Sequence, residues 1–144
     1  MEINQYAVLK AQKSIEIMAP ADTVFNLLAE ISSWPQWQPD VTSAELPDGL
    51  AVGHVFHWKA AGLNITSKIQ ELELNSRIGW TGKSLGMQAV HRWRLEVIER
   101  GTQVTTEESL NGWFAQLLKL FDPHFLEKSL VNSLKVLKNQ AEQK

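Results

Sequence analysis

The chain has 144 residues, of which 44% are hydrophobic and 21% are charged, and its net charge is −2. This composition predicts one globular domain over residues 1–144, and the slightly negative charge argues against a nucleic-acid partner. The sequence contains no apolar run of the ~20 residues that stable membrane insertion needs. There is no cysteine, and the N-terminus does not resemble a signal peptide, so a cytoplasmic location is expected. Six tryptophans are many for this length and indicate a need for large, flat apolar surfaces.

The first 40 residues predict a strand and then one or two short helices. Residues 6–18 end in the alternating pattern of a strand, and MAPADTVFNLLAEI follows with an apolar stripe at helical spacing. Pro20 suits the first turn of this helix. The helix should end before SSWPQWQPD, where Pro35 and Pro39 push the residues before them out of the helical region.

The middle of the chain alternates with a period of two and contains turn signals at short intervals. The expected strands are 41–46, 53–60, 63–74, 77–83, 87–99 and 102–110, with the last turn at Arg100-Gly101. Short connections between successive strands favour antiparallel pairing in a meander.

The last third changes to a helical period. One apolar face carries Phe114, Leu117, Leu118 and Phe121, and a second carries Leu126, Leu130, Leu134, Leu137 and Ala141. Asp122-Pro123 between them either breaks the helix or restarts it. We therefore expect an α+β fold in which a seven-stranded curved sheet wraps around one long C-terminal helix. A single helix cannot fill such a sheet, so a cavity should remain between them.

Three segments carry a family resemblance: APADTVFNLLAEISSWPQWQPDV, GTQVTTEES and LKVLKNQAE. With the order of the elements, they resemble the polyketide cyclase/dehydrase and lipid-transport family of the START-like (SRPBCC) superfamily, which includes the birch-pollen allergens. The resemblance implies a helix-grip fold with an apolar cavity for lipids, sterols, polyketides or similar molecules. It brings no catalytic motif, so no catalytic residue is carried over from it.

His91 interrupts the apolar side of the strand GMQAVHRWRLEV, whose other inward positions include Met87, Ala89, Trp93, Leu95 and Val97. It is interpreted in three ways: as a neutral core histidine, as a polar group that orients a ligand, or as a general acid or base. Glu107 and Glu108 are the candidate partners for acid–base chemistry, and they lie on opposite faces of their strand.

The aromatic residues supply the expected cavity wall. Together with His91, the predicted ligand-binding residues are Phe56, Trp58, Trp80, Trp93, Phe114, Leu118 and Phe121. Trp34 and Trp37 are interpreted either as structural packing or as a lid at the cavity mouth.

No cofactor and no metal are expected. His54 and His57 are three residues apart on a strand and face opposite sides, and Gly82-Lys83-Ser84 lacks the context of a phosphate loop. The leading hypothesis is binding, or transport, of a hydrophobic small molecule by a monomer or weak homodimer. One alternative is a cofactor-free cyclase, dehydratase or hydrolase with His91 as acid/base. A second is a protein-interaction domain, which a large exposed apolar patch would favour.

Overall fold

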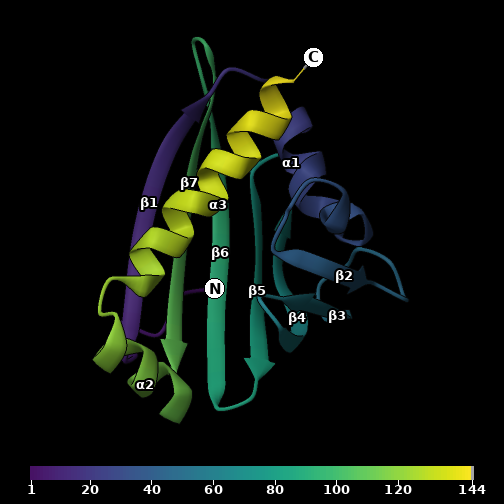
Figure 1. Cartoon of the computed structure of the whole chain (residues 1–144). Coiled ribbons are helices and arrows are strands. Elements are labelled where there is room, and N and C mark those ends of the chain that lie inside the picture. Colours follow the sequence, from purple (N-terminus) through teal and green to yellow (C-terminus); the bar gives the residue numbers. More distant parts are fainter. Residues whose placement is uncertain (144) are drawn as a thin grey trace.

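The computed structural model describes residues 1–143 and is built on one curved, antiparallel sheet of seven strands (Figure 1). The strands are β1 Leu9–Ile17, β2 Val41–Glu45, β3 Val55–Ala60, β4 Leu63–Glu73, β5 Arg77–Ser84, β6 Met87–Ile98 and β7 Gly101–Asn111. Their order in the sheet is β1-β7-β6-β5-β4-β3-β2, so β2 to β7 form the expected meander and β1 adds to its far edge.

All the helices except the one that directly follows β7 lie on the concave face of the sheet (Figure 1). After β1 come α1, Ala21–Ala29, and the 3-10 helix η1, Ile31–Gln36; after β7 come α2, Trp113–Phe121, and α3, Phe125–Glu142. Figure 1 shows α3 running diagonally across the sheet, and its buried residues are the predicted stripe Leu126, Leu130, Leu134, Leu137 and Ala141. The expected helix-grip fold is therefore confirmed. No helix among residues 1–143 combines the length and apolarity needed to cross a bilayer.

The strand predictions hold to within three residues at each end, and one inward position is exposed. Residues 6–8 and 53–54 precede β1 and β3 instead of belonging to them. Val97 was expected on the inward face of β6, but its side chain is exposed. The end of the β6–β7 hairpin extends beyond the cover of the helices, so alternation no longer implies burial there.

The position of α2 corrects a second expectation. The helical region is broken at Asp122-Pro123, between α2 and α3. Because of this break, α2 packs at one end of the sheet instead of continuing α3 along the concave face (Figure 1). Its inner residues Phe114, Ala115 and Leu118 join a small cluster with Leu9, Met87, Leu110 and Leu126. Its opposite face points away from the protein.

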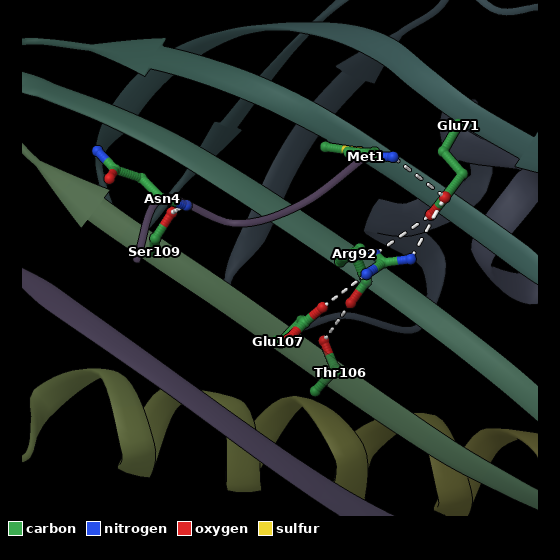
Figure 2. A network of polar contacts seen from close by, with 7 residues as sticks. All are labelled: Met1, Asn4, Glu71, Arg92, Thr106, Glu107 and Ser109. Carbon is green, nitrogen blue, oxygen red and sulfur yellow. Dashed lines mark hydrogen bonds and ion pairs between the residues drawn. The ribbon is translucent and has the colours of Figure 1, made fainter. Parts of the chain in front are cut away.

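Charged side chains fasten the convex face of the sheet. Arg92 on β6 donates to Glu71 of β4 from Nε at 3.3 Å and to Glu107 of β7 from Nη1 at 2.9 Å (Figure 2). The amine of Met1 lies 3.8 Å from Glu71, and the backbone N–H of Asn4 donates to Ser109 Oγ. Because side chains alternate along a strand, the neighbours of Arg92 and Glu107, His91 and Glu108, point to the concave face.

Candidate functional site

A cavity of about 200 Å³ lies between the sheet and α3, and aromatic side chains form much of its wall. A second compartment of about 170 Å³ adjoins it and shares Trp58, Trp80, Glu108 and Ser129 with it. The two compartments together reach the lower end of the ~300–1,000 Å³ that small-molecule sites usually occupy. The expected space between sheet and helix is therefore present.

Four tryptophans from four elements meet at the first compartment: Trp34 of η1, Trp58 of β3, Trp80 of β5 and Trp93 of β6. The ring of Trp34 is central, with its centroid 5.1 Å from that of Trp58 and 5.3 Å from that of Trp80. Trp34 donates its indole N–H to the carbonyl of Leu28, and Trp58 donates to Ser67 Oγ. Hydrogen bonds and edge contacts thus hold these two rings in fixed orientations.

Trp93 differs from Trp34 and Trp58 in its hydrogen bonding. Its indole Nε1 is buried and has no partner among the residues that the structure describes. A buried indole N–H ordinarily finds an acceptor. Trp93, which lines the cavity, therefore carries an unused buried donor.

His91 sits between two of these tryptophans. Its ring centroid lies 5.4 Å from that of Trp80, which is its cross-strand partner on β5, and 5.2 Å from that of Trp93. Its Nε2 lies 2.8 Å from Thr106 Oγ1, and the Thr106 hydroxyl donates its own proton to the carbonyl of Arg92. Because that hydroxyl has only one hydrogen, Nε2–H must be the donor to it. This chain of bonds assigns the tautomer and leaves Nδ1 as a free acceptor.

The register of β6 and β7 places Glu108 directly opposite His91. Its Oε1 lies 3.6 Å from His91 Nδ1, which is too far for a hydrogen bond. Both side chains are mostly buried, with 12% of His91 and 17% of Glu108 exposed, and both line the first compartment. A group from a bound molecule could therefore contact both.

Burial sets the charge of this pair. Desolvation raises the pKa of Glu108 from 4.5 to about 8 and lowers the pKa of His91 from 6.5 to about 3. Near neutral pH the carboxyl is thus protonated and the imidazole is neutral. The pair then offers one O–H donor and one nitrogen acceptor without net charge, which suits an uncharged polar group and can also exchange a proton with it.

The structure brings together half of the predicted ligand-binding residues. Trp58, Trp80, His91 and Trp93 line the cavity, and their ligand-binding role remains a prediction. Phe56 is fully buried behind them, where it packs against Trp34, Trp58 and Trp80.

The other three predicted residues belong to α2 and lie outside the cavity wall. Phe114 and Leu118 pack in the cluster at the end of the sheet, and Phe121 is 82% exposed. The expectation that Phe121 lines the cavity is wrong, because the break at Asp122-Pro123 turns α2 away from the concave face.

Sequence reasoning missed the contribution of α3 to the cavity. Ser129, Asn132, Ser133 and Val136 line its first compartment, and none of them is among the predicted site residues. Their spacing of i, i+3, i+4 and i+7 was the available signal, because it traces one continuous face beside the leucine stripe. Trp34, considered only as packing or lid, also belongs to the wall, while Trp37 packs against the core.

Comparison with known proteins agrees with this architecture. The family described as "Polyketide cyclase / dehydrase and lipid transport" matches residues 8–142, and the chain belongs to this family. No relative was found among curated protein sequences.

Similar solved structures show the same fold at low sequence identity. The hypothetical protein jhp0584 from Helicobacter pylori superposes with a TM-score of 0.84 at 18% identity, over 97% of this chain and 92% of that one. Zhui aromatase/cyclase from Streptomyces sp. R1128 gives 0.79 at 16% identity, over 93% of each chain. A START superfamily protein from Mycobacterium smegmatis gives 0.75 at 15% identity, over 93% of this chain and 97% of that one.

Proposed function

We propose that the protein binds an uncharged, largely apolar and preferably aromatic small molecule whose polar end meets His91 and Glu108. The observation that carries this proposal is the placement of a neutral donor–acceptor pair inside a wall of tryptophans. Family membership supports a hydrophobic guest in general terms. Transport of the same molecule is the natural extension of binding it.

The apolar part of the ligand would supply most of the affinity. Burial of apolar surface contributes about 25 cal/mol per Å², and flat rings match the stacked and edge-on geometry that the tryptophans offer. An empty, dry cavity of about 200 Å³ would destabilise the fold by on the order of 5 kcal/mol at the rate seen for core truncations. A bound molecule removes this penalty.

The polar part would supply orientation. Protonated Glu108 can donate to a carbonyl oxygen, and His91 Nδ1 can accept from a hydroxyl or amide N–H. A ligand carboxylate would be excluded, because it would bring a negative charge into a mostly buried site that contains no cation. We therefore expect ketones, phenols, amides or lactones in preference to organic acids.

The first test is native mass spectrometry of freshly purified protein, followed by solvent extraction and mass analysis of the released compound. We expect an uncharged compound with at least one ring and one carbonyl or hydroxyl. His91→Phe should lose most of it, while His57→Phe on the exposed side of β3 should retain it. Equal retention by both variants, or an extracted organic acid, would overturn the proposed recognition.

A second candidate function is acid–base catalysis in the same cavity, as in a cyclase or dehydratase. The specific observation that favours it is that both a carboxyl and a hydroxyl lie beside His91. His91 Nδ1 would take a proton from the carbon next to a ligand carbonyl while Glu108 gives its proton to the carbonyl oxygen, which yields the enol. The test is deuterium incorporation into a bound diketone in heavy water. Incorporation that both His91→Phe and Glu108→Gln abolish would establish catalysis, and none in the native protein would exclude this step.

A further inference from the structure

The outer face of α2 is apolar although it faces away from the protein. Trp113, Leu117, Leu120 and Phe121 are all exposed, with Leu120 at 76% and Phe121 at 82%. Their spacing of i, i+4, i+7 and i+8 puts them on one side of the helix. Because the inner side is packed against the sheet, α2 is apolar on both sides, which is typical of a helix that something else covers.

The neighbouring β5–β6 turn extends this surface. Trp113 lies against Gly86, and the backbone N–H of Phe114 donates to the Gly86 carbonyl at 3.0 Å, so the start of α2 is fixed to the turn. Leu85 in the same turn is 72% exposed. We call Leu85, Trp113, Leu117, Leu120 and Phe121 the α2 patch. The two segments that carry it, α2 and the β5–β6 turn, lie at the same end of the molecule (Figure 1).

The charges around the patch are unbalanced in favour of cations. Lys119 of α2 and Lys83 at the end of β5 are exposed, and neither has an acidic partner within residues 1–143. Of the nearby acidic groups, Asp122 pairs with Lys128 at 2.9 Å, and Glu127 lies 3.9 Å from His124, an ion pair only when His124 is protonated. An apolar surface with free lysines at its border complements a layer of apolar chains beneath anionic headgroups.

From these features we propose that α2 docks the protein on a lipid membrane that carries anionic headgroups. Trp113 and Phe121 suit the boundary between headgroups and acyl chains, and the long stem of Lys119 lets its ammonium group reach the headgroups. In a dimer of two copies related by a two-fold axis through the patch, Lys83 and Lys119 of one copy would instead approach Lys83 and Lys119 of the other. Their like charges would repel each other. Charge thus favours the lipid surface over a second copy.

Docking at this end would also place the cavity next to the membrane. The second compartment is lined by Lys83, Ser84, Met87 and Phe125, which border α2 and the β5–β6 turn. A hydrophobic molecule could then pass between bilayer and cavity with little exposure to water. The docking itself does not depend on the proposed ligand, so His91→Phe should bind membranes as the native protein does.

The test is co-flotation of the full chain with vesicles of phosphatidylcholine, with and without phosphatidylglycerol. We expect binding to the anionic vesicles that weakens at high salt. Leu120→Ser and Phe121→Ser should each weaken it by about tenfold, since each removes a large apolar side chain. Lys119→Glu should weaken it as well. Leu74→Ser and Val97→Ser replace equally exposed residues at the opposite end of the sheet and should have no effect.

Three further measurements make the outcomes decisive. Brominated lipid chains should quench tryptophan fluorescence in the native protein but not in Trp113→Phe, which keeps the patch apolar. Analytical ultracentrifugation without lipid gives the oligomeric state, and circular dichroism checks that each variant is folded. Absence of vesicle binding would overturn the proposal. A dimer that Leu120→Ser dissociates, with no vesicle binding, would assign the patch to a second copy instead.

Discussion

His91 Nδ1 and Glu108 Oε1 face each other at 3.6 Å across the β6–β7 ladder, one as a free acceptor and the other as a protonated carboxyl. Burial keeps the proton of the pair on Glu108 and leaves His91 neutral near neutral pH. The hydrogen bond from Nε2 to Thr106 fixes the ring and keeps Nδ1 toward the carboxyl.

The first prediction separates the roles of His91. His91→Phe should reduce the affinity for an extracted or added ligand by about tenfold, which is the contribution of one net hydrogen bond. It should leave the thermal midpoint of unfolding nearly unchanged, because the phenylalanine ring still fits between Trp80 and Trp93. Calorimetric titration and thermal unfolding measure the two effects. A large fall in midpoint with unaltered affinity would identify His91 as a core residue only.

The pH dependence of stability forms the second prediction. Above pH 4.5 the unfolded chain releases the Glu108 proton, whereas the folded chain keeps it up to about pH 8, so this group lowers stability as the pH rises through that range. The unfolded chain protonates His91 below pH 6.5, but the folded chain does so only near pH 3, so stability also falls toward acid. The two slopes oppose each other between pH 4.5 and 6.5.

Thermal midpoints measured from pH 3 to pH 8 should therefore be highest between pH 4.5 and 6.5. Glu108→Gln should remove the loss on the alkaline side, because glutamine stays neutral in both states. His91→Phe should reduce the loss on the acid side. An alkaline slope that survives in Glu108→Gln would show that another group causes it.

The third prediction compares adjacent carboxyls on opposite faces of β7. Glu107→Gln weakens the bond to Arg92 on the convex face and should destabilise the fold by about 1–2 kcal/mol without changing ligand affinity. Glu108→Gln should change ligand affinity and leave the Arg92 contacts intact. Urea unfolding and ligand titration of both variants test the contrast, and similar effects on affinity would contradict the assignment of faces.

Trp34 provides the fourth prediction. Its side chain is only 2% exposed and touches Phe56, Trp58 and Trp80, so Trp34→Ala should destabilise the fold by about 3–5 kcal/mol. Trp37 is less buried, and Trp37→Ala should have a smaller effect. Urea unfolding measures both, and equal losses would contradict the central position of Trp34 in the wall.

A fifth prediction concerns Phe121. Because its side chain is exposed on α2, Phe121→Ser should change stability by no more than about 0.5 kcal/mol and leave ligand retention unaltered. Trp80→Ala is the comparison, because it opens the cavity wall and should reduce retention. A lower affinity of purified Phe121→Ser for added ligand, measured without membranes, would show that α2 reaches the cavity in solution.

Local patterns were sufficient to predict the strands and the gripping helix. Met87 to Leu95 alternate inward and outward as the sheet requires, and the stripe from Leu126 to Ala141 marks the buried side of α3. These properties depend on near neighbours in the chain, so periodicity captures them. The need of one large sheet face for cover predicted how sheet and helix combine, and the resemblance to a family agreed with it.

The pairing of His91 with Glu108 depended on the position of one turn. Ile98 pairs with Gly101, so the loop is Glu99-Arg100, and this register puts Glu108 opposite His91. The sequence suggested a turn at Arg100-Gly101, one position later. With that turn, Leu110 and not Glu108 would lie opposite His91. A shift of one residue in a hairpin loop thus decides which side chains meet, and residue preferences in turns do not resolve it.

The direction of α2 could not be predicted for a related reason. In the sequence, Phe114 and Phe121 fit one apolar face, which could be either a cavity wall or an exposed surface. In the structure Phe114 is packed and Phe121 is exposed, and the angle at Asp122-Pro123 determines this outcome. That angle follows from how Phe114 and Leu118 pack against Met87 and Leu126, contacts between segments far apart in the sequence.

The clamp that Arg92 forms with Glu71 and Glu107 has a consequence for the evolution of this cavity. It ties β4, β6 and β7 together from the outside, through residues that face away from the cavity. Inward positions such as His91 and Glu108 can then be exchanged while the sheet keeps its curvature. New ligand preferences can therefore arise by single substitutions on one face, because the frame that carries them is maintained by the other.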